Sequence, residues 1–292
     1  MGTFVQLLVN GLGKGAVFAL LALGFVVIYK STEVINFAHG SLALIGGYVI
    51  ALTHETLGFW LAALLGIVGA AVAALLVERL LLARSRNADP AALALLTIGV
   101  DVVVVEDVFR RLGTRVPFLG APWDARPIRI AGVAIFSTQL VALLVGLVLI
   151  TAFFLAFRYT NWGVAMRAQA ENREAAALMG IRSSRVTATA WLVGGALAAV
   201  AVTFIVTQDF SGSGLSRTTH AIAFAAFPAA IIGGLDSTAG AVVGGIVVGL
   251  TQALTEVYVS IPFAKVAVFL VMLLVLVVRP SGLFGSRVLS RV

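Results

Sequence analysis

The sequence is organised around one long polar run, Arg158-Tyr-Thr-Asn-Trp-Gly-Val-Ala-Met-Arg-Ala-Gln-Ala-Glu-Asn-Arg-Glu-Ala-Ala-Ala-Leu-Met-Gly-Ile-Arg-Ser-Ser-Arg185, with hydrophobic segments on both sides. From Gly163 to Met179 the run predicts a short amphipathic helix. Arg167, Glu171 and Glu174 fall at i, i+4 and i+7, so they share one face on which Arg167 and Glu171 can pair. Gly180 is well placed to close the helix in a left-handed conformation. A polar helix inside an apolar chain must lie in water on one side of a bilayer, where it can present a docking surface.

The composition indicates a polytopic membrane protein. The chain has 292 residues, of which 61% are hydrophobic and 11% charged, whereas soluble domains carry about 25% charged residues. The 20 basic residues are spread through the loops rather than clustered with aromatic residues, so no nucleic-acid partner is expected. The absence of Cys excludes disulfides and thiolate metal sites. The N-terminus lacks the basic region of a signal peptide, so we expect the first hydrophobic segment to be retained as a span.

We predict an all-α protein with a single transmembrane domain over residues 1–292 and eight or nine spans. Several of the segments are shorter than the roughly 20 residues that cross a bilayer, so one or two are expected to be half-helices. Pro228 should kink or break the seventh. The expected spans are 4–29, 35–52, 58–82, 91–109, 131–157, 186–208, 218–235, 239–258 and 263–278.

Basic residues near the span ends predict the orientation. Twelve of the 20 Lys and Arg residues lie on the same side as the polar loop 158–185, which places this loop in the cytoplasm, the N-terminus outside and the C-terminus inside. The chain also shows an internal echo: His39 precedes Ile45-Gly-Gly47, and His220 precedes Ile232-Gly-Gly234. In this topology the two units point in opposite directions, as in the inverted repeats of many transporters. The alternative is chance, since the chain holds 30 glycines.

A second informative stretch is Val34-Ile-Asn-Phe-Ala-His-Gly-Ser-Leu-Ala-Leu-Ile-Gly-Gly-Tyr48. Asn36 can cap a helix here, and a helix N-terminus inside a membrane favours a carboxylate. Asn36, His39 and Ser41 are polar groups at apolar depth, where they are costly unless satisfied. These residues, with His220, are candidates for lining a substrate pathway. The alternative is that they join helices through hydrogen bonds.

A third stretch is rich in glycine: Gly233-Gly-Leu-Asp-Ser-Thr-Ala-Gly-Ala-Val-Val-Gly-Gly-Ile-Val-Val-Gly249. Asp236 or Ser237 can cap the helix that follows. Small residues spaced four apart let helix backbones approach closely, which favours a packing role over a functional one. The glycines assigned to packing are Gly233, Gly234, Gly240, Gly244, Gly245 and Gly249.

The acidic residues of the fourth span have two interpretations. Asp101, Glu106 and Asp107 could form a proton relay, as in secondary transporters. We favour an interfacial position for Glu106 and Asp107 beside Arg110 and Arg111, which leaves Asp101 as the residue on which a relay would depend. Catalytic motifs and a phosphate-binding loop are missing from the sequence, so we assign no catalytic residue, no cofactor and no ATP site. Isolated histidines do not make a metal site.

Four stretches together resemble the branched-chain amino acid permeases of bacterial ABC importers. They are Gly163-Val-Ala-Met-Arg-Ala168 with Glu171-Asn172 and Ala175-Ala-Ala-Leu-Met-Gly-Ile181; Ile35-Asn-Phe-Ala-His-Gly40; the glycine-rich stretch; and the end Val278-Arg-Pro-Ser-Gly-Leu-Phe-Gly285. The resemblance implies that the polar loop is the cytoplasmic coupling helix that seats in the ATPase subunit. The residues expected to carry the coupling are Arg167, Glu171, Asn172, Glu174, Ala175 and Gly180. The short N-terminus and the early His39 motif are similar to those of the smaller permease of the pair.

The resemblance also implies a function and an assembly. The chain is expected to be the permease subunit of an importer for branched-chain or other hydrophobic amino acids in the bacterial inner membrane. Its partners would be a second and usually different permease, two ATPase subunits, a periplasmic substrate-binding protein and membrane lipid. Two alternatives stay open: a permease of a urea or short-chain amide importer, and a proton-coupled transporter that uses Asp101.

Overall fold

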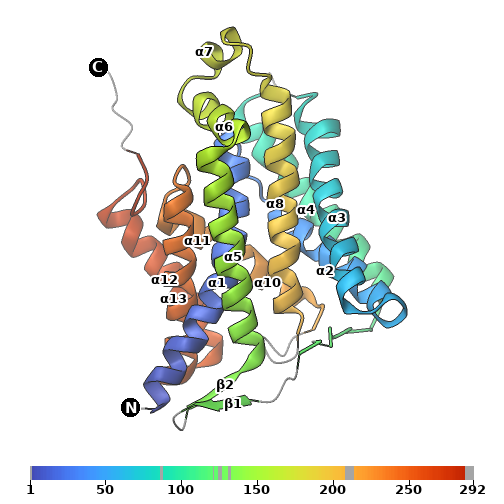
Figure 1. Ribbon diagram of the computed structural model, residues 1–292, viewed down its shortest axis with the longest axis vertical. Coiled ribbons are helices and arrows are strands. Elements are labelled where there is room, and N and C mark those ends of the chain that lie inside the picture. Colours follow the sequence, from blue (N-terminus) through green and yellow to red (C-terminus); the bar gives the residue numbers. More distant parts are fainter. Residues whose placement is uncertain are drawn as a thin grey trace.

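The computed structural model describes residues 2–85, 88–120, 122–123, 127–130, 133–207 and 214–286, and this part of the chain is mainly helical (Figure 1). The helices are α1 Gly2–Thr32, α2 His39–Leu57, α3 Phe59–Val77, the π-helical turn η1 Glu78–Leu82, α4 Pro90–Leu112, α5 Ser137–Tyr159, α6 Asn161–Glu171, α7 Arg173–Leu178, α8 Ser183–Ile205, α10 Arg217–Phe224, α11 Ala226–Gly233, α12 Thr238–Tyr258 and α13 Ile261–Val278. A short antiparallel hairpin pairs β1 Pro127–Ile130 with β2 Val133–Phe136.

Among the described residues, six helices are long and apolar enough to cross a membrane. They are Phe4–Thr32, Phe59–Leu82, Ser137–Tyr159, Ser183–Ile205, Thr238–Tyr258 and Ile261–Val278. The prediction of a mainly helical, multi-pass membrane protein is therefore confirmed, whereas the count of eight or nine spans is not. The other three predicted segments form α2, α4 and the pair α10–α11, which do not meet the same criteria of length and apolar character.

The bundle is built around α1, which is buried along most of its length and packs on α12, α8 and α5. The outer helices α3, α5 and α13 instead expose large apolar side chains: Trp60 is 73% exposed, Leu147 61% and Val277 84%. Exposed apolar surface of this extent needs lipid or a protein partner to cover it. A polar loop and a hairpin cap the two ends of the bundle, α6 and α7 at one end and β1–β2 at the other (Figure 1).

The end that carries α6 and α7 also holds the turn between α11 and α12 and the segment after α13. Lys30 near the end of α1 donates to the Asp236 carbonyl over 2.8 Å. The backbone N–H groups of Leu283 and Phe284 donate to the carbonyls of Ile232 and Gly233, each over 2.9 Å. The segment after α13 therefore folds back and supplies donors to carbonyls at the C-terminal end of α11, which have no partner within that helix.

Two predicted boundaries are wrong. The span expected at 131–157 begins only at Ser137, because the apolar, β-branched residues before it pair as strand β2. The span expected at 35–52 begins at His39 and continues to Leu57. Helix α1 is continuous through its polar residues near Lys14. Lys14 is accommodated there because it forms an ion pair with Glu256 of α12.

The amphipathic helix predicted from Gly163 to Met179 is split in two. Asn172 is extended, with φ −154° and ψ 105°, and its side chain accepts from the Ala175 N–H over 2.9 Å, so it ends α6 and caps α7. Gly180 has φ +83°, which confirms the predicted left-handed closing residue. Arg167 does not pair with Glu171. It donates to the Phe157 carbonyl and lies 5.4 Å from the centre of the Phe157 ring. A cation near the C-terminal carbonyls of α5 is favoured by the helix dipole.

Pro228 breaks the seventh segment as predicted. α10 ends at Phe224 and α11 begins at Ala226, with Pro228 in the first turn of α11. Proline has no N–H and clashes with the carbonyl four residues before it, so the break falls just ahead of it. Of the two candidate caps for α12, Ser237 takes that role, because its hydroxyl accepts from the Gly240 N–H over 3.0 Å.

Candidate functional site

The segment between α1 and α2 returns into the bundle before α2 begins. Glu33 starts this segment with φ 60°, a left-handed conformation that is uncommon outside glycine. His39 Nε2 lies 3.0 Å from the Leu21 carbonyl oxygen of α1. Leu21 lies 11 residues before the end of α1, which is roughly 16 Å along the helix axis. α2 therefore starts beside the interior of α1 rather than beside its C-terminal end.

Asn36 shapes this start without capping α2. Its Oδ1 accepts from the Ala38 N–H over 3.1 Å, whereas the N-cap position of α2 is Ala38 and has no side-chain cap. The prediction that Asn36 caps α2 is therefore wrong, because the Asn36 side chain closes a tight turn just before the helix begins. Ser41 is fully buried and donates to the Ala38 carbonyl over 2.9 Å, so its hydroxyl serves the first turn of α2. Asn36 Nδ2 and His39 Nδ1 are buried with no partner among the described residues.

Aromatic rings fill the space around the start of α2. Phe25 of α1 lies 5.9 Å from His39 and 5.7 Å from Phe227, measured between ring centres. Phe37 lies 6.4 Å from Phe224 and 5.5 Å from Phe227. The free space left between these rings and Asn36, His39 and Gly40 is about 10 Å³. We call Phe25, Phe37, Phe224 and Phe227 the aromatic cluster. These rings close the space beside the start of α2.

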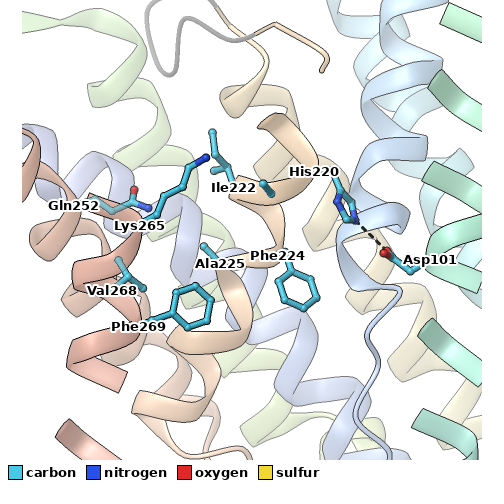
Figure 2. A pocket seen from close by; sticks show the side chains of 10 residues that line it. Asp101, His220, Ile222, Phe224, Ala225, Gln252, Lys265, Val268 and Phe269 are labelled. Atoms are coloured by element: carbon cyan, nitrogen blue, oxygen red, sulfur yellow. Dashed lines mark hydrogen bonds and ion pairs between the residues drawn. The ribbon is translucent and has the colours of Figure 1, made fainter. Parts of the chain in front are cut away.

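α10 brings His220 beside α2 and α4. A Cβ on Gly40 would lie 3.2 Å from His220 Nε2, so the starts of α2 and α10 are neighbours. His220 Nε2 lies 3.0 Å from Asp101 Oδ1, and both side chains are partly exposed, at 19% and 17% (Figure 2). Phe224 borders both the closed aromatic cluster and a larger groove of about 440 Å³ on the outer side of α10. The groove is lined by Asp101, His220, Ile222, Gln252, Lys265 and Phe269, among others.

The other acidic residues of α4 are used in ion pairs. Asp107 lies 2.6 Å from Arg110 and 2.6 Å from Arg111, as predicted. Glu106 forms its ion pair with a different arginine. It makes a bidentate pair of 2.8 Å with Arg217 at the start of α10, which joins α4 to α10 a second time.

At the far end of the bundle, α6 and α7 present a mixed polar and apolar surface to solvent. Arg167, Glu171 and Glu174 are exposed, and so are Asn172, Ala175 and Gly180. Leu178 and Met179, at the end of α7, are 89% and 83% exposed. Apolar side chains this exposed beside charged residues are typical of a docking surface. We call these exposed residues of α6, α7 and Gly180 the tip surface.

The tip surface is bonded to the end of α1. Gln169 Nε2 and Arg173 each donate to the Ser31 carbonyl over 2.8 Å. Ser31 stands two residues before Glu33, where the segment leading to α2 begins. The polar loop is therefore bonded to Ser31, and eight residues further along the chain α2 starts at His39.

The glycines of the third stretch allow α12 to approach its neighbours at backbone distance. A Cβ on Gly244 would lie 1.9 Å from the Ala229 carbonyl, one on Gly245 2.3 Å from Ala19 N and one on Gly249 2.2 Å from Gly15 N. Gly240 and Gly233 face each other, since a Cβ on either would lie within 2.2 Å of the other's carbonyl oxygen. Gly234 has φ +108° and turns the chain from α11 into α12.

The helical bundle, its six long apolar helices and its exposed apolar surface together define a multi-pass membrane protein. A family model described as branched-chain amino acid transport system / permease component matches residues 7–278. The chain belongs to this family.

Named relatives cover nearly the whole chain. It is 31% identical to the high-affinity branched-chain amino acid transport system permease protein LivH of Escherichia coli, over 99% of this chain and 98% of the relative. It is 30% identical to a probable branched-chain amino acid transport permease protein LivH of Methanocaldococcus jannaschii, over 96% of both chains. It is 28% identical to BraD of Pseudomonas aeruginosa, over 99% of this chain and 98% of the relative. No solved structure matches. These relatives favour the permease interpretation over the amide importer and the proton-coupled transporter.

Three features of the structure were not predictable from the sequence. Asp101 and His220 were each singled out, but they are 119 residues apart in the chain and no local pattern pairs them. Lys265 and Gln252 were not connected with the site, although both line the groove. The bonds from Gln169 and Arg173 to Ser31 carried no sequence signal beyond the polarity of the loop.

Proposed function

We propose that this chain is the permease subunit of an ATP-driven importer of branched-chain amino acids. Membership of the permease family across residues 7–278 carries this proposal. The protein would form the substrate pathway, while ATP hydrolysis takes place on separate subunits. It would lie in the bacterial inner membrane as one transmembrane domain, with two ATPase subunits, a second permease and a periplasmic substrate-binding protein as partners.

The tip surface is the proposed contact with the ATPase subunit. Its six predicted residues are all exposed, and the same loop carries the exposed apolar pair Leu178 and Met179. The six are Arg167, Glu171, Asn172, Glu174, Ala175 and Gly180. An apolar centre with a polar rim is the usual anatomy of a protein interface. This assignment places the tip end in the cytoplasm and the hairpin end outside.

Force from the ATPase would reach the pathway through α1. Gln169 and Arg173 hold the Ser31 carbonyl. A displacement of the tip surface therefore pulls on the last turn of α1 and on Glu33, whose left-handed conformation costs about 1–3 kcal/mol. A strained residue at the end of a helix is a suitable hinge. The segment beyond it leads directly to His39 and the aromatic cluster.

The pathway itself would pass the start of α2. Asn36, His39 and His220 are its proposed lining, with Ser41 holding the first turn of α2. Asn36 Nδ2 and His39 Nδ1 have no described partner, and buried polar groups without partners at such depth favour a role with a ligand or water. The small residual space of about 10 Å³ describes a closed pathway.

The inverted repeat and the nine segments are part of the same proposal. α1 followed by α2 corresponds to α8 followed by α10–α11, and α1 packs on α8 along the bundle. The neighbouring starts of α2 and α10 support this correspondence. α10 and α11 would then be the half-length helices, while α2, with 19 residues, is long enough to span. Gly233, Gly234, Gly240, Gly244, Gly245 and Gly249 would serve helix packing.

Removing the tip charges tests the coupling. Arg167→Ala, Glu171→Ala and Glu174→Ala in one variant should lower ATP-driven leucine uptake by roughly tenfold or more, since a few residues dominate an interface. ATPase activity of the detached subunits should remain. The control variant, Glu55→Ala with Arg115→Ala, removes exposed charges at the hairpin end and should transport normally. Normal uptake by the triple variant would remove the coupling assignment.

A further inference from the structure

The groove beside α10 is lined by two ionisable groups of opposite charge, Asp101 and Lys265. Asp101 stands in the middle of α4, and Lys265 follows the first turn of α13. Ionisable groups inside a membrane face a water-filled cavity or another protein group rather than lipid. Both residues line the same groove of about 440 Å³, on either side of α10. Its size falls in the range of small-molecule sites.

Neither charge is fully satisfied within the described chain. Asp101 Oδ1 takes the contact with His220 at 3.0 Å, while Asp101 Oδ2 has no hydrogen bond to a described residue. Lys265 is exposed and makes no ion pair with a described residue. Figure 2 shows His220 turned towards Asp101 on one side of α10, with Lys265 and Gln252 on the other. The groove therefore offers one anionic wall and one cationic wall.

Between these walls the surface is apolar. Ile222, Phe224 and Ala225 contribute it from α10, and Val268 and Phe269 from α13. Gln252 adds an amide beside Lys265. A ligand that satisfies all of these groups carries a cation, an anion and an apolar side chain. A zwitterionic α-amino acid with an aliphatic side chain has this chemistry.

We propose that Asp101, Lys265 and the apolar floor of α10 form a binding subsite for an aliphatic α-amino acid. The ammonium group binds Asp101 Oδ2, the carboxylate binds on the side of Lys265 and Gln252, and the side chain packs on Phe224 and Phe269. This inference rests on the proposed function for the choice of leucine as probe. Phe224 also borders the aromatic cluster, so the subsite opens onto the closed part of the pathway.

A purely structural role for the Asp101–His220 pair is the alternative. Such a pair would tie α4 to α10, as Glu106 and Arg217 do. It would account for Asp101 but leave Lys265 without a purpose. A purely structural pair also predicts that leucine does not change the accessibility of the groove, and this difference can be tested by experiment.

The absence of native cysteine makes the test direct. Ala225→Cys places a single thiol in the groove, and the intact importer in nanodiscs is labelled with a charged, water-soluble thiol reagent read on this subunit. Leucine at ten times its Kd should slow labelling about tenfold. 4-Methylpentanoate lacks the ammonium and isopentylamine lacks the carboxylate, so neither should protect at that concentration. Val103→Cys, 68% exposed on the apolar surface, should resist labelling throughout.

Two variants locate the subsite. Asp101→Asn and Lys265→Met, each in the Ala225→Cys background, should raise the protecting leucine concentration about tenfold or more, since each removes a charge-assisted hydrogen bond. Unhindered labelling without leucine, with normal elution from a sizing column, shows that the fold is kept. Glu106→Gln is the matched control on α4 and should leave protection unchanged.

The outcomes separate the subsite from the proposed function. Protection that survives in Asp101→Asn and Lys265→Met, or no protection in a complex that takes up leucine with ATP, overturns the subsite alone. A complex that takes up no leucine overturns the proposed function. Protection lost in both variants but kept in Glu106→Gln supports the subsite.

Discussion

His39 and His220 stand at echoing places in the sequence but in opposite surroundings. His39 opens α2, is 3% exposed and is bonded to the Leu21 carbonyl inside the aromatic cluster. His220 lies in the first turns of α10, borders the groove of about 440 Å³ and contacts Asp101. The starts of α2 and α10 therefore differ: the first is closely packed, and the second borders open space. We expect perturbations at the first to act on folding and at the second on ligand binding.

The largest difference should come from a permanent charge at each histidine. His39→Lys buries an ammonium with no acid beside it, and an uncompensated buried charge costs about 3–5 kcal/mol. His220→Lys keeps its charge next to Asp101 in a partly exposed site. We expect His39→Lys to yield little folded protein and His220→Lys near wild-type amounts, measured by fluorescence-detected size exclusion. Equal yields would contradict the contrast between the two sites.

A smaller difference should come from one added methyl group at each site. On Gly24 it would lie 2.9 Å from the Gly194 carbonyl and 3.0 Å from the His39 ring. On Gly40 it would meet the movable His220 ring at 3.2 Å. Alanine favours the helix more than glycine does, but at Gly24 its methyl group would clash with backbone atoms. We expect the free energy of unfolding of Gly24→Ala to be lower by about 1–2 kcal/mol and that of Gly40→Ala to be unchanged. Thermal unfolding midpoints in detergent check this order, and a larger loss for Gly40→Ala would reverse it.

The smallest effect is expected at the exposed start of α10. Arg217→Gln removes the bidentate pair with Glu106, whose side chains are 60% and 61% exposed. Solvent-exposed ion pairs contribute little to stability. The unfolding midpoint of Arg217→Gln should therefore match that of the wild type, and leucine protection in the groove should persist. A clear loss of stability would show that α10 is held in place mainly by this pair.

Local patterns predicted the features that depend on adjacent residues. The apolar runs indicated the membrane class. Pro228 predicted the break before α11, and Gly180 predicted the end of the helical part of the polar loop. These succeed because hydrophobicity, a missing N–H and a left-handed φ are set within a few residues. The amphipathic pattern around Asn172 was misleading, because a side-chain cap competed with helix continuation at one residue.

Partners across the bundle were not predictable in this way. Arg167 turned to the Phe157 carbonyl instead of Glu171, and Glu106 to Arg217 instead of Arg110. The expected partners, Glu171 for Arg167 and Arg110 for Glu106, are close in sequence. The packing of α5 on α6 offered Arg167 a better acceptor, and the position of α4 beside α10 offered Glu106 a better donor. The predicted span at 131–157 lost its first residues for a local reason, because they pair with the preceding strand β1 in a hairpin.

The sequence by itself determined that this chain is a membrane protein, that its seventh segment breaks near Pro228 and which loop is polar, because each of these depends on the properties of a short segment. Only the tertiary structure decided that one histidine is sealed among aromatic rings while the other borders an open groove with Asp101 and Lys265 on its walls. That decision depends on distances between α2, α4, α10 and α13, which no stretch of neighbouring residues contains.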